Sequence, residues 1–306
     1  MKNLSKTKIG INYVKQSANS YLSYLILLKI EMKKSIITFL FLTLIIISCK
    51  PTMIYKDITY TKNSRGEDVK LNIFTPKNTK NKANPVLIFV YGGNWNSGSK
   101  EKYGLLGRNF ARKNLMVVIP DYTLSPNANV DEMTKEIASA IQFTKENAAK
   151  YHGDPNRIFI SGHSAGGQLA TSAVMNPKYG IAHHTISGII LIDAAGIDMK
   201  NYLEKYPPTS EDNYDVTWSK NPENWKQASS IYFINDKTPP FLIYIGEKTY
   251  PSIKLANENL IKALNPFQPN VKPIFLNKKH VPMVLQYFLP WSIRLDEAKA
   301  FIENVK

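Results

Sequence analysis

The sequence has almost no cysteine, with only Cys49 among its 306 residues. A single thiol excludes an intramolecular disulfide framework. The hydrophobic share of 43% and the charged share of 21% are ordinary for a globular protein. The length suits one large α/β domain or two small ones.

Acidic residues are few compared with basic ones, and the formal net charge is +15. Residues 1–48 carry seven Lys and one Glu, so a net charge of +9 remains for the rest of the chain. Arg is scarce, and the lysines are scattered without stacking aromatic side chains among them. This pattern argues against a nucleic-acid partner and favours a solvated surface with a mild attraction to anionic surfaces.

The apolar run near the start of the chain, residues 35–47, is too short to span a bilayer comfortably, which takes about 20 residues. Lys33 and Lys34 precede this run, and a small residue follows it, as in a secretory signal. We therefore interpret residues 32–48 as a signal peptide that starts at Met32. Residues 1–31 would be an upstream or non-native extension, and residues 49–56 a tether.

The break after this run reads Ile46-Ile47-Ser48-Cys49 and resembles the lipobox of bacterial lipoproteins. The resemblance implies that Cys49 becomes the lipidated first residue of the mature protein. It also implies an exported protein that is anchored to a membrane of a bacterial cell envelope. A plain signal anchor with an incidental cysteine is the alternative.

From residue 57 onward, short apolar segments alternate with helical ones. Residues 57–62 and 68–75 predict a hairpin around an Asn-Ser-Arg-Gly turn. Buried strands are predicted at 85–91, 115–120, 158–160, 187–194, 240–246 and 271–276, and helices at 101–114, 131–150, 253–264 and 295–305. This alternation predicts one α/β domain over 57–306, with a mostly parallel mixed sheet and helices on both faces.

Residues 197–236 interrupt the alternation with aromatic side chains among polar ones. We interpret this segment as an insertion. It either forms a cap over the site or packs against the domain without touching a substrate.

The stretch Gly162-His163-Ser164-Ala165-Gly166 fits the pattern G-x-S-x-G between a buried strand and an Ala-rich helix. In this context the pattern predicts a nucleophile elbow, in which Ser164 is exposed at the carboxyl end of the sheet. An ordinary Gly-rich turn is the alternative.

A serine nucleophile needs a base, and His280 follows the last predicted strand, at the edge of the sheet where Ser164 is expected. His163 adjoins the serine, but strand alternation predicts that its side chain points away. A surface histidine is the alternative for His280.

The acid of the site is harder to assign. Glu247 is the only carboxylate in the loop after the predicted strand 240–246, so we predict that it orients His280. Asp193, at the end of the preceding strand, and Asp236 are the alternatives, as is a site with no acid.

The oxyanion hole should combine the backbone amide of Ala165 with amides of the loop after the first central strand, Tyr91-Gly92-Gly93-Asn94-Trp95. A plain Gly-Gly turn is the alternative. We predict no metal and no cofactor.

Three motifs together resemble the α/β-hydrolase superfamily, closest to esterases of the hormone-sensitive-lipase and kynurenine-formamidase kind. They are Tyr91-Gly-Gly-Asn-Trp95, Asp121-Tyr-Thr-Leu-Ser-Pro126 and Gly162-His-Ser-Ala-Gly-Gly167. The resemblance implies that Gly93, Asn94 and Ala165 are the oxyanion donors. The chain departs from the family pattern at two places. Tyr91 replaces a histidine, and Thr249 stands where the acid usually lies.

The resemblance implies a serine hydrolase that cleaves small carboxylic esters, including acyl groups on glycans, without a cofactor. The expected partners are therefore a small ester or acylated-glycan substrate and a membrane reached through the lipid anchor. An amidase or peptidase on the same fold is one alternative. A non-catalytic lipoprotein that binds glycans or a partner is the other.

Overall fold

The computed structural model describes residues 28–36, 51–77 and 83–305. The chain divides into two units, residues 1–50 and residues 51–306. In the first unit, residues 28–36 form a helix. Most of the predicted signal peptide, and Cys49 with it, lies outside the described residues. No helix among the described residues is both long and apolar enough to cross a membrane.

The second unit is built on one sheet of eight strands in the order β1-β2-β4-β3-β5-β6-β7-β8. β1 pairs antiparallel with β2, and β2 with β4, while all other neighbours are parallel. The strands are β1 (Thr52–Lys62), β2 (Asp68–Pro76), β3 (Asn84–Val90), β4 (Met116–Pro120), β5 (Gly153–His163), β6 (Gly188–Ile192), β7 (Phe241–Gly246) and β8 (Ile274–Leu276). The predicted α/β class with a mostly parallel mixed sheet is confirmed.

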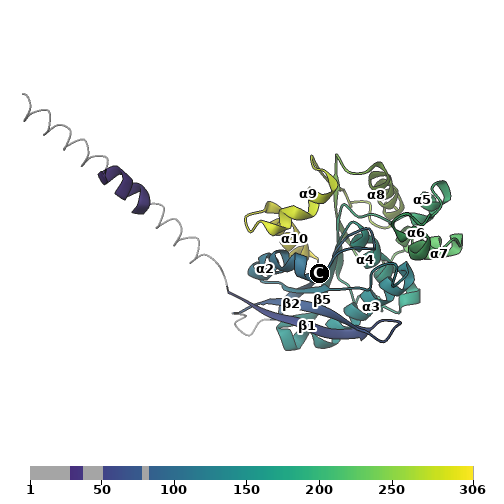
Figure 1. Ribbon diagram of the computed structural model, residues 1–306, viewed down its shortest axis with the longest axis horizontal. Helices are drawn as coiled ribbons and strands as arrows, with labels where there is room; N and C mark the ends of the chain where they lie inside the picture. The colour runs from purple at the N-terminus through teal and green to yellow at the C-terminus, as the bar shows by residue number, and fades with distance from the viewer. Residues whose placement is uncertain (1–27, 37–50, 78–82, 306) are drawn as a thin grey trace, which may run out of the picture. The chain divides into compact units, whose positions relative to one another are not determined.

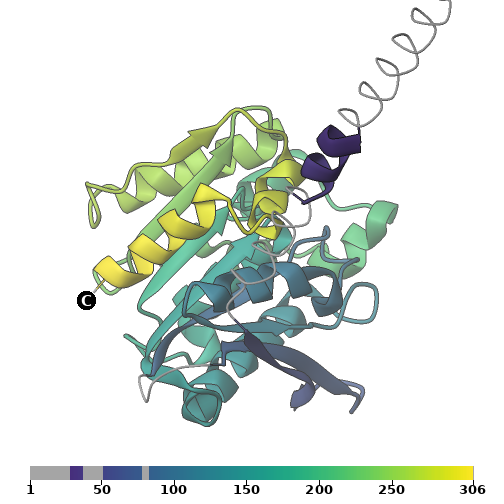
Figure 2. The ribbon, with the colours of Figure 1, turned by 90° about the vertical axis from the view of Figure 1, so that its left-hand side faces the viewer.

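Helices cover both faces of the sheet (Figure 1). α2 and α10 lie on one side, and α3, α4 and α8 lie on the other. Their bounds are α2 (Gly104–Arg112), α3 (Val130–Asn147), α4 (Ala165–Met175), α8 (Pro251–Leu264) and α10 (Ile293–Asn304). Figure 2 shows the second unit from the side of α10, which crosses in front of the sheet.

The central strands are uninterrupted apolar segments because both of their faces are covered. β3, β4 and β6 are buried along nearly their whole length. α3 starts with a complete capping box, in which Asn129 and Glu132 exchange side-chain-to-backbone hydrogen bonds. These features fix the frame that holds the loops at the carboxyl ends of β3, β5, β6 and β7.

Two segments differ from their predictions. β1 begins at Thr52 and pairs with β2 as far as Pro76, so most of the predicted tether belongs to the sheet. The alternation of polar and apolar residues is weak there because β1 is an edge strand in which no residue is fully buried. His280, predicted in a loop, is the first residue of the short helix α9 (His280–Leu285).

Candidate active site

The elbow around Ser164 has the strained geometry that the motif predicts. β5 ends at His163, α4 begins at Ala165, and Ser164 between them has φ 53° and ψ −128°. A Cβ atom on Gly162 would lie 2.3 Å from the carbonyl oxygen of Gly166. Only glycine fits this close approach of strand and helix, and the turn directs the serine hydroxyl toward a cavity.

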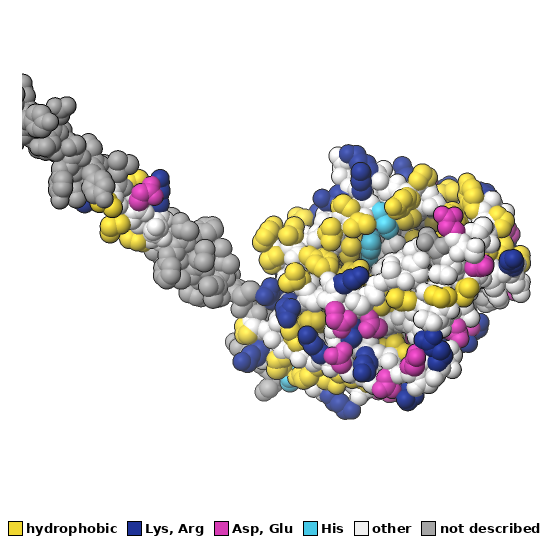
Figure 3. Space-filling view, viewed as in Figure 1, with side chains coloured by type: hydrophobic (Ala, Val, Ile, Leu, Met, Phe, Trp, Pro, Cys, Tyr) yellow, Lys and Arg dark blue, Asp and Glu magenta, His cyan; other side chains and the backbone are white. Residues whose placement is uncertain are grey.

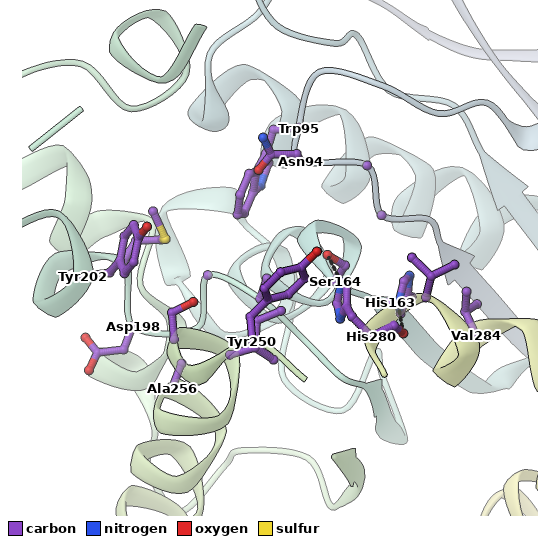
Figure 4. Close-up of a pocket in the computed structure, with 18 of the residues that line it drawn as sticks. Asn94, Trp95, His163, Ser164, Asp198, Tyr202, Tyr250, Ala256, His280 and Val284 are labelled. Atoms are coloured by element: carbon purple, nitrogen blue, oxygen red, sulfur yellow. Dashed lines mark hydrogen bonds between the residues drawn. The ribbon is translucent and has the colours of Figure 1, made fainter. Parts of the chain in front are cut away.

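A chain of hydrogen bonds runs from this serine to a buried carboxylate. Ser164 Oγ lies 2.8 Å from His280 Nε2, as Figure 4 shows, and His280 Nδ1 lies 2.6 Å from Asp193 Oδ2. Asp193 is fully buried, and Ser164 is 9% exposed. The structure therefore brings together the predicted nucleophile, the predicted base and one of the alternative acids.

Glu247 does not take the position expected of the acid. Its side chain is exposed, and the carboxylate that contacts His280 belongs to Asp193. Asp193 follows β6 with φ 50° and accepts hydrogen bonds from the Gly246 amide, at 2.9 Å, and from the Thr249 hydroxyl. The geometry thus corrects the assignment of Glu247. The turn after β6 brings the carboxylate of Asp193 across to the end of β7, where it contacts His280.

The other alternative acid, Asp236, is also exposed, in the loop that leads to β7. Thr249 stands where the sequence resemblance implied the acid, and its hydroxyl donates a hydrogen bond to Asp193. One sequence signal pointed to Asp193. It is the charged residue that directly ends the apolar run Ile189-Ile190-Leu191-Ile192, next to the elbow strand.

His163 lies differently from its prediction. Its ring stacks on that of His280 at a centroid distance of 4.7 Å, so the side chain points toward the site. Strand alternation fails because β5 ends at this residue and the backbone turns sharply at Ser164. Burial, together with the neighbouring His280, lowers the pKa of His163 to about 3, which makes its ring neutral at physiological pH.

The loop predicted to form the oxyanion hole also borders the cavity, through Gly92, Gly93 and Asn94. Asn94 has φ 51°, and its side-chain oxygen accepts a hydrogen bond of 2.9 Å from the Tyr214 hydroxyl. Ala165 is the first residue of α4, where backbone amides have no partner within the helix. These positions are those expected of oxyanion donors.

Tyr91, which stands where the sequence resemblance implied a histidine, supports this loop through hydrogen bonds. Its hydroxyl donates to Asp121 Oδ1 at 3.0 Å, and the Tyr122 hydroxyl donates to the Tyr91 carbonyl at 3.0 Å. The amide of Ser125 donates to the Trp95 carbonyl at 3.0 Å. The Asp121-to-Pro126 motif is thus tied to the glycine loop by three hydrogen bonds.

The cavity around Ser164 has a volume of about 960 Å³. On one side it is lined by Val284 and Phe288, which follow His280 in the chain. Asp198 and Tyr202 line it on the side of the insertion, and Figure 4 shows them across the cavity from His280. Figure 3 shows the hollow with histidine side chains, in cyan, at its surface.

Residues 197–236 both line this cavity and pack against the domain. The segment contains α5 (Met199–Lys205), α6 (Tyr214–Trp218) and α7 (Pro222–Gln227). Trp218 of α6 is 1% exposed and packs edge-on against Trp95 of the glycine loop, with ring centroids 4.8 Å apart. The insertion therefore joins the loop that borders Ser164 to the core.

Metal ligands were not predicted. Among the residues that the structure describes, no group of three or more His, Cys, Asp or Glu side chains is arranged to hold a metal ion.

Comparisons with known proteins agree with this architecture. Residues 71–262 match the model of the BD-FAE family. A probable isoprenylcysteine alpha-carbonyl methylesterase of Arabidopsis thaliana is 25% identical over 240 residues, which is 71% of this chain and 49% of the relative. Esterase LipQ of Mycobacterium tuberculosis is 31% identical over 179 residues, 54% of this chain and 42% of the relative. The chain thus spans about half the length of these relatives, or less.

Solved structures resemble the second unit closely. A thermophilic esterase of Thermogutta terrifontis, with butyrate bound, superposes with a TM-score of 0.67 at 22% identity, over 82% of this chain and 94% of that one. Esterase B of Lactobacillus rhamnosis superposes with a TM-score of 0.68 at 16% identity, over 84% of this chain and 87% of that one. These likenesses show the α/β-hydrolase fold, and the match over residues 71–262 shows that the chain belongs to the BD-FAE family.

Proposed function

We propose that the protein is a serine hydrolase of the carboxylesterase type that cleaves small carboxylic esters. One observation carries this proposal: Ser164, His280 and Asp193 form an unbroken chain of hydrogen bonds beside a cavity of about 960 Å³. Membership of the BD-FAE family and the esterase names of several relatives support it.

The reaction would proceed through an acyl-enzyme. Ser164 Oγ attacks the ester carbonyl while His280 Nε2 accepts the hydroxyl proton. The tetrahedral intermediate collapses, the alkoxide leaves, and His280 returns the proton to it. A water molecule then attacks the acyl group, its proton passing to His280 and on to Ser164, which releases the acid.

Asp193 would hold His280 in the required tautomer. Its Oδ2 lies 2.6 Å from Nδ1, so it accepts a hydrogen bond from Nδ1–H and leaves Nε2 free to take the proton of the serine. As His280 becomes positively charged, the buried carboxylate stabilises the charge. The Gly246 amide donates to Oδ1 of this carboxylate and the Thr249 hydroxyl donates to Oδ2, so both oxygens are fixed.

The negative charge on the carbonyl oxygen would be stabilised by backbone amides of Gly93, Asn94 and Ala165. Loss of one such donor typically lowers turnover by about 10²–10³-fold. The Tyr214-to-Asn94 hydrogen bond supports this role, because it anchors the loop through the side-chain oxygen of Asn94.

The substrate would be a small carboxylic ester or an acylated glycan. The cavity pairs an apolar wall, through Val284 and Phe288, with a polar one that includes Asp198. A non-catalytic binding role was motivated by the uncertain acid of the site. The contact between the Asp193 carboxylate and His280 supports the hydrolase over that role.

The cellular location remains a proposal from the sequence. We infer that the protein is exported and anchored to a membrane of a bacterial cell envelope through a lipid on Cys49. The basic residues, short apolar run and Ser48-Cys49 break support this inference.

Labelling of the full chain with a fluorophosphonate probe tests the proposed activity. The probe should modify the wild-type protein, which should also hydrolyse p-nitrophenyl acetate. Ser164→Ala should lose both, whereas Ser139→Ala, on the outer helix α3, should keep both. A folded wild-type sample without labelling or turnover would refute the proposal, as would labelling that persists in Ser164→Ala.

A further inference from the structure

The chain has no Lys, Arg, Asp or Glu from His280 to Ile293. Half of the residues in this segment are nevertheless exposed, and all of the exposed ones are apolar. We call them the apolar rim: Val281, Pro282, Leu285, Leu289, Pro290, Trp291 and Ile293. Trp291 is 77% exposed, an unusual position for a side chain of this size. A contiguous exposed apolar surface marks a site of interaction.

The rim is continuous in space. It follows α9 and the short 3-10 helix η6 (Gln286–Phe288), with Val281 and Leu285 four residues apart on α9 and Leu289 directly after η6. α2 packs against η6 and carries the exposed side chain of Leu105. Tyr103, the residue before α2, places its ring 5.8 Å from that of Phe288. Figure 3 shows hydrophobic side chains gathered over α9, beside the histidines at the hollow.

The rim also joins the cavity of the site. Val281 and Leu285 line the cavity although both are exposed, so the apolar wall continues from the inside of the pocket to the outer surface. A second protein seated on the rim would cover this side of the entrance. A lipid surface would instead bring apolar molecules to it.

Charges around the rim favour an anionic partner. Lys278 and Lys279 directly precede it, and Lys102 lies at the edge of the cavity with an exposed side chain. The next acids along the chain, Asp296 and Glu297, form ion pairs with Lys113 and Arg294. The lysines beside the apolar rim can therefore attract anionic headgroups.

We propose that the apolar rim is a membrane-contact surface, which inserts into an anionic lipid layer with Trp291 at the interface. Surfaces that bind membranes typically combine aliphatic side chains, an exposed tryptophan and flanking lysines. The contact needs no catalytic step and is independent of the proposed ester hydrolysis. If that function holds, esters dissolved in the lipid would reach Ser164 past Val281 and Leu285.

Tryptophan quenching in the full chain tests the contact. The other three tryptophans, Trp95, Trp218 and Trp225, are at most 6% exposed, so quenching by brominated acyl chains reports on Trp291. Vesicles of brominated phosphatidylcholine with phosphatidylglycerol should quench the emission, vesicles without phosphatidylglycerol less so, and added salt should weaken it. Trp291→Phe should remove the quenched component.

Two charge variants of matched exposure locate the contact. Leu289 is 44% exposed, and Phe267, beyond the far end of α8, is 47% exposed. Leu289→Glu should lower the ratio of vesicle-bound to unbound protein about tenfold. The substitution replaces an apolar side chain that would contact the lipid with a negatively charged one. Phe267→Glu should leave quenching as in the wild type, and both variants should keep the wild-type melting temperature.

The readout distinguishes this surface from the start of the chain. Residues 1–50 could bind vesicles by themselves, and the protein would then co-sediment with lipid without quenching of Trp291. That result would overturn the proposal, as would equal effects of Leu289→Glu and Phe267→Glu. A lipid-free dimer that Leu289→Glu dissociates would assign the rim to a second copy of the chain and would also overturn it.

Discussion

At the scale of single residues, the position of Asp193 determines how His280 is held. Its carboxylate is fully buried and receives hydrogen bonds from three groups, on His280, Gly246 and Thr249. A buried charge requires such partners, since desolvation would otherwise favour its neutral form. The two groups besides His280 are contributed by the end of β7 and the loop after it. The Asp193 carboxylate is thus held by the loop after β7, the loop in which the sequence predicted the acid.

Replacement of the two candidate acids separates their roles. Asp193→Asn should lower turnover on p-nitrophenyl acetate about 10⁴-fold, the size of effect seen when a Ser-His-Asp protease loses this charge. Glu247→Gln should keep wild-type turnover, because its side chain is exposed to solvent. Melting curves of both variants would show that they fold. Strong loss of turnover in Glu247→Gln would contradict the assignment from geometry.

His163 should make stability depend on pH. Its pKa is lowered to about 3 in the folded protein, against about 6.5 in an unfolded chain, so between these values only the unfolded state binds the proton. Stability should therefore fall as the pH drops through this window, by about 2 kcal/mol from pH 7 to pH 5 for this residue alone. Urea unfolding at the two pH values measures the change.

A variant without the titrating group isolates this contribution. His163→Phe keeps a ring against His280 and should reduce the pH dependence by the same amount. His183→Phe, the same replacement at an exposed histidine, should retain it. An identical pH dependence in wild type and His163→Phe would show that His163 is not the source.

At the scale of secondary-structure elements, the insertion and the glycine loop act as one unit. Tyr214 of α6 donates to Asn94, and its ring lies edge-on to Trp95 at 6.2 Å. The Trp95 indole in turn donates to the Gln168 side chain of α4 at 2.9 Å. The loop that would carry two oxyanion donors is therefore held between the insertion and the elbow helix.

Removal of one hydroxyl should test this coupling. Tyr214→Phe keeps the ring but loses the bond to Asn94, so turnover should fall by up to about tenfold while stability falls by about 1 kcal/mol. Tyr179→Phe loses a comparable hydroxyl bond, to Asp131, far from Ser164. It should cost similar stability and leave turnover unchanged. Equal turnover in the two variants would argue against positioning by Tyr214.

The elements that the sequence predicted well are those in which local and tertiary preferences agree. The apolar run before Ser164 and the amphipathic α3 are examples, because each has a period and clear ends. α9 was missed, since its six residues are too few to show a helical period. The sequence ranked Glu247 ahead of Asp193 for another reason. Which carboxylate reaches His280 depends on how far the turn after β6 extends toward β7, and the local pattern around Asp193 does not encode that distance.

At the scale of the whole molecule, two independent features point toward a membrane. One is the apolar rim beside the site, and the other is the signal-like segment that ends at Cys49. A lipid on Cys49 would raise the local concentration of the domain at a bilayer, where even a weak contact through the rim could form. The described residues carry the first feature, and only the sequence carries the second.

Metabolic labelling with palmitate in a bacterial host tests the lipid anchor directly. A single acylated cysteine should incorporate the label and place the protein in the membrane fraction, because acyl chains contribute about 0.8 kcal/mol per buried methylene group. Cys49→Ala should abolish the label, whereas Ser48→Ala, which keeps a small residue before the break, should retain it. Label that persists in Cys49→Ala would refute the lipid anchor. It would not contradict the proposed membrane contact of the apolar rim, since the quenching of Trp291 does not depend on Cys49.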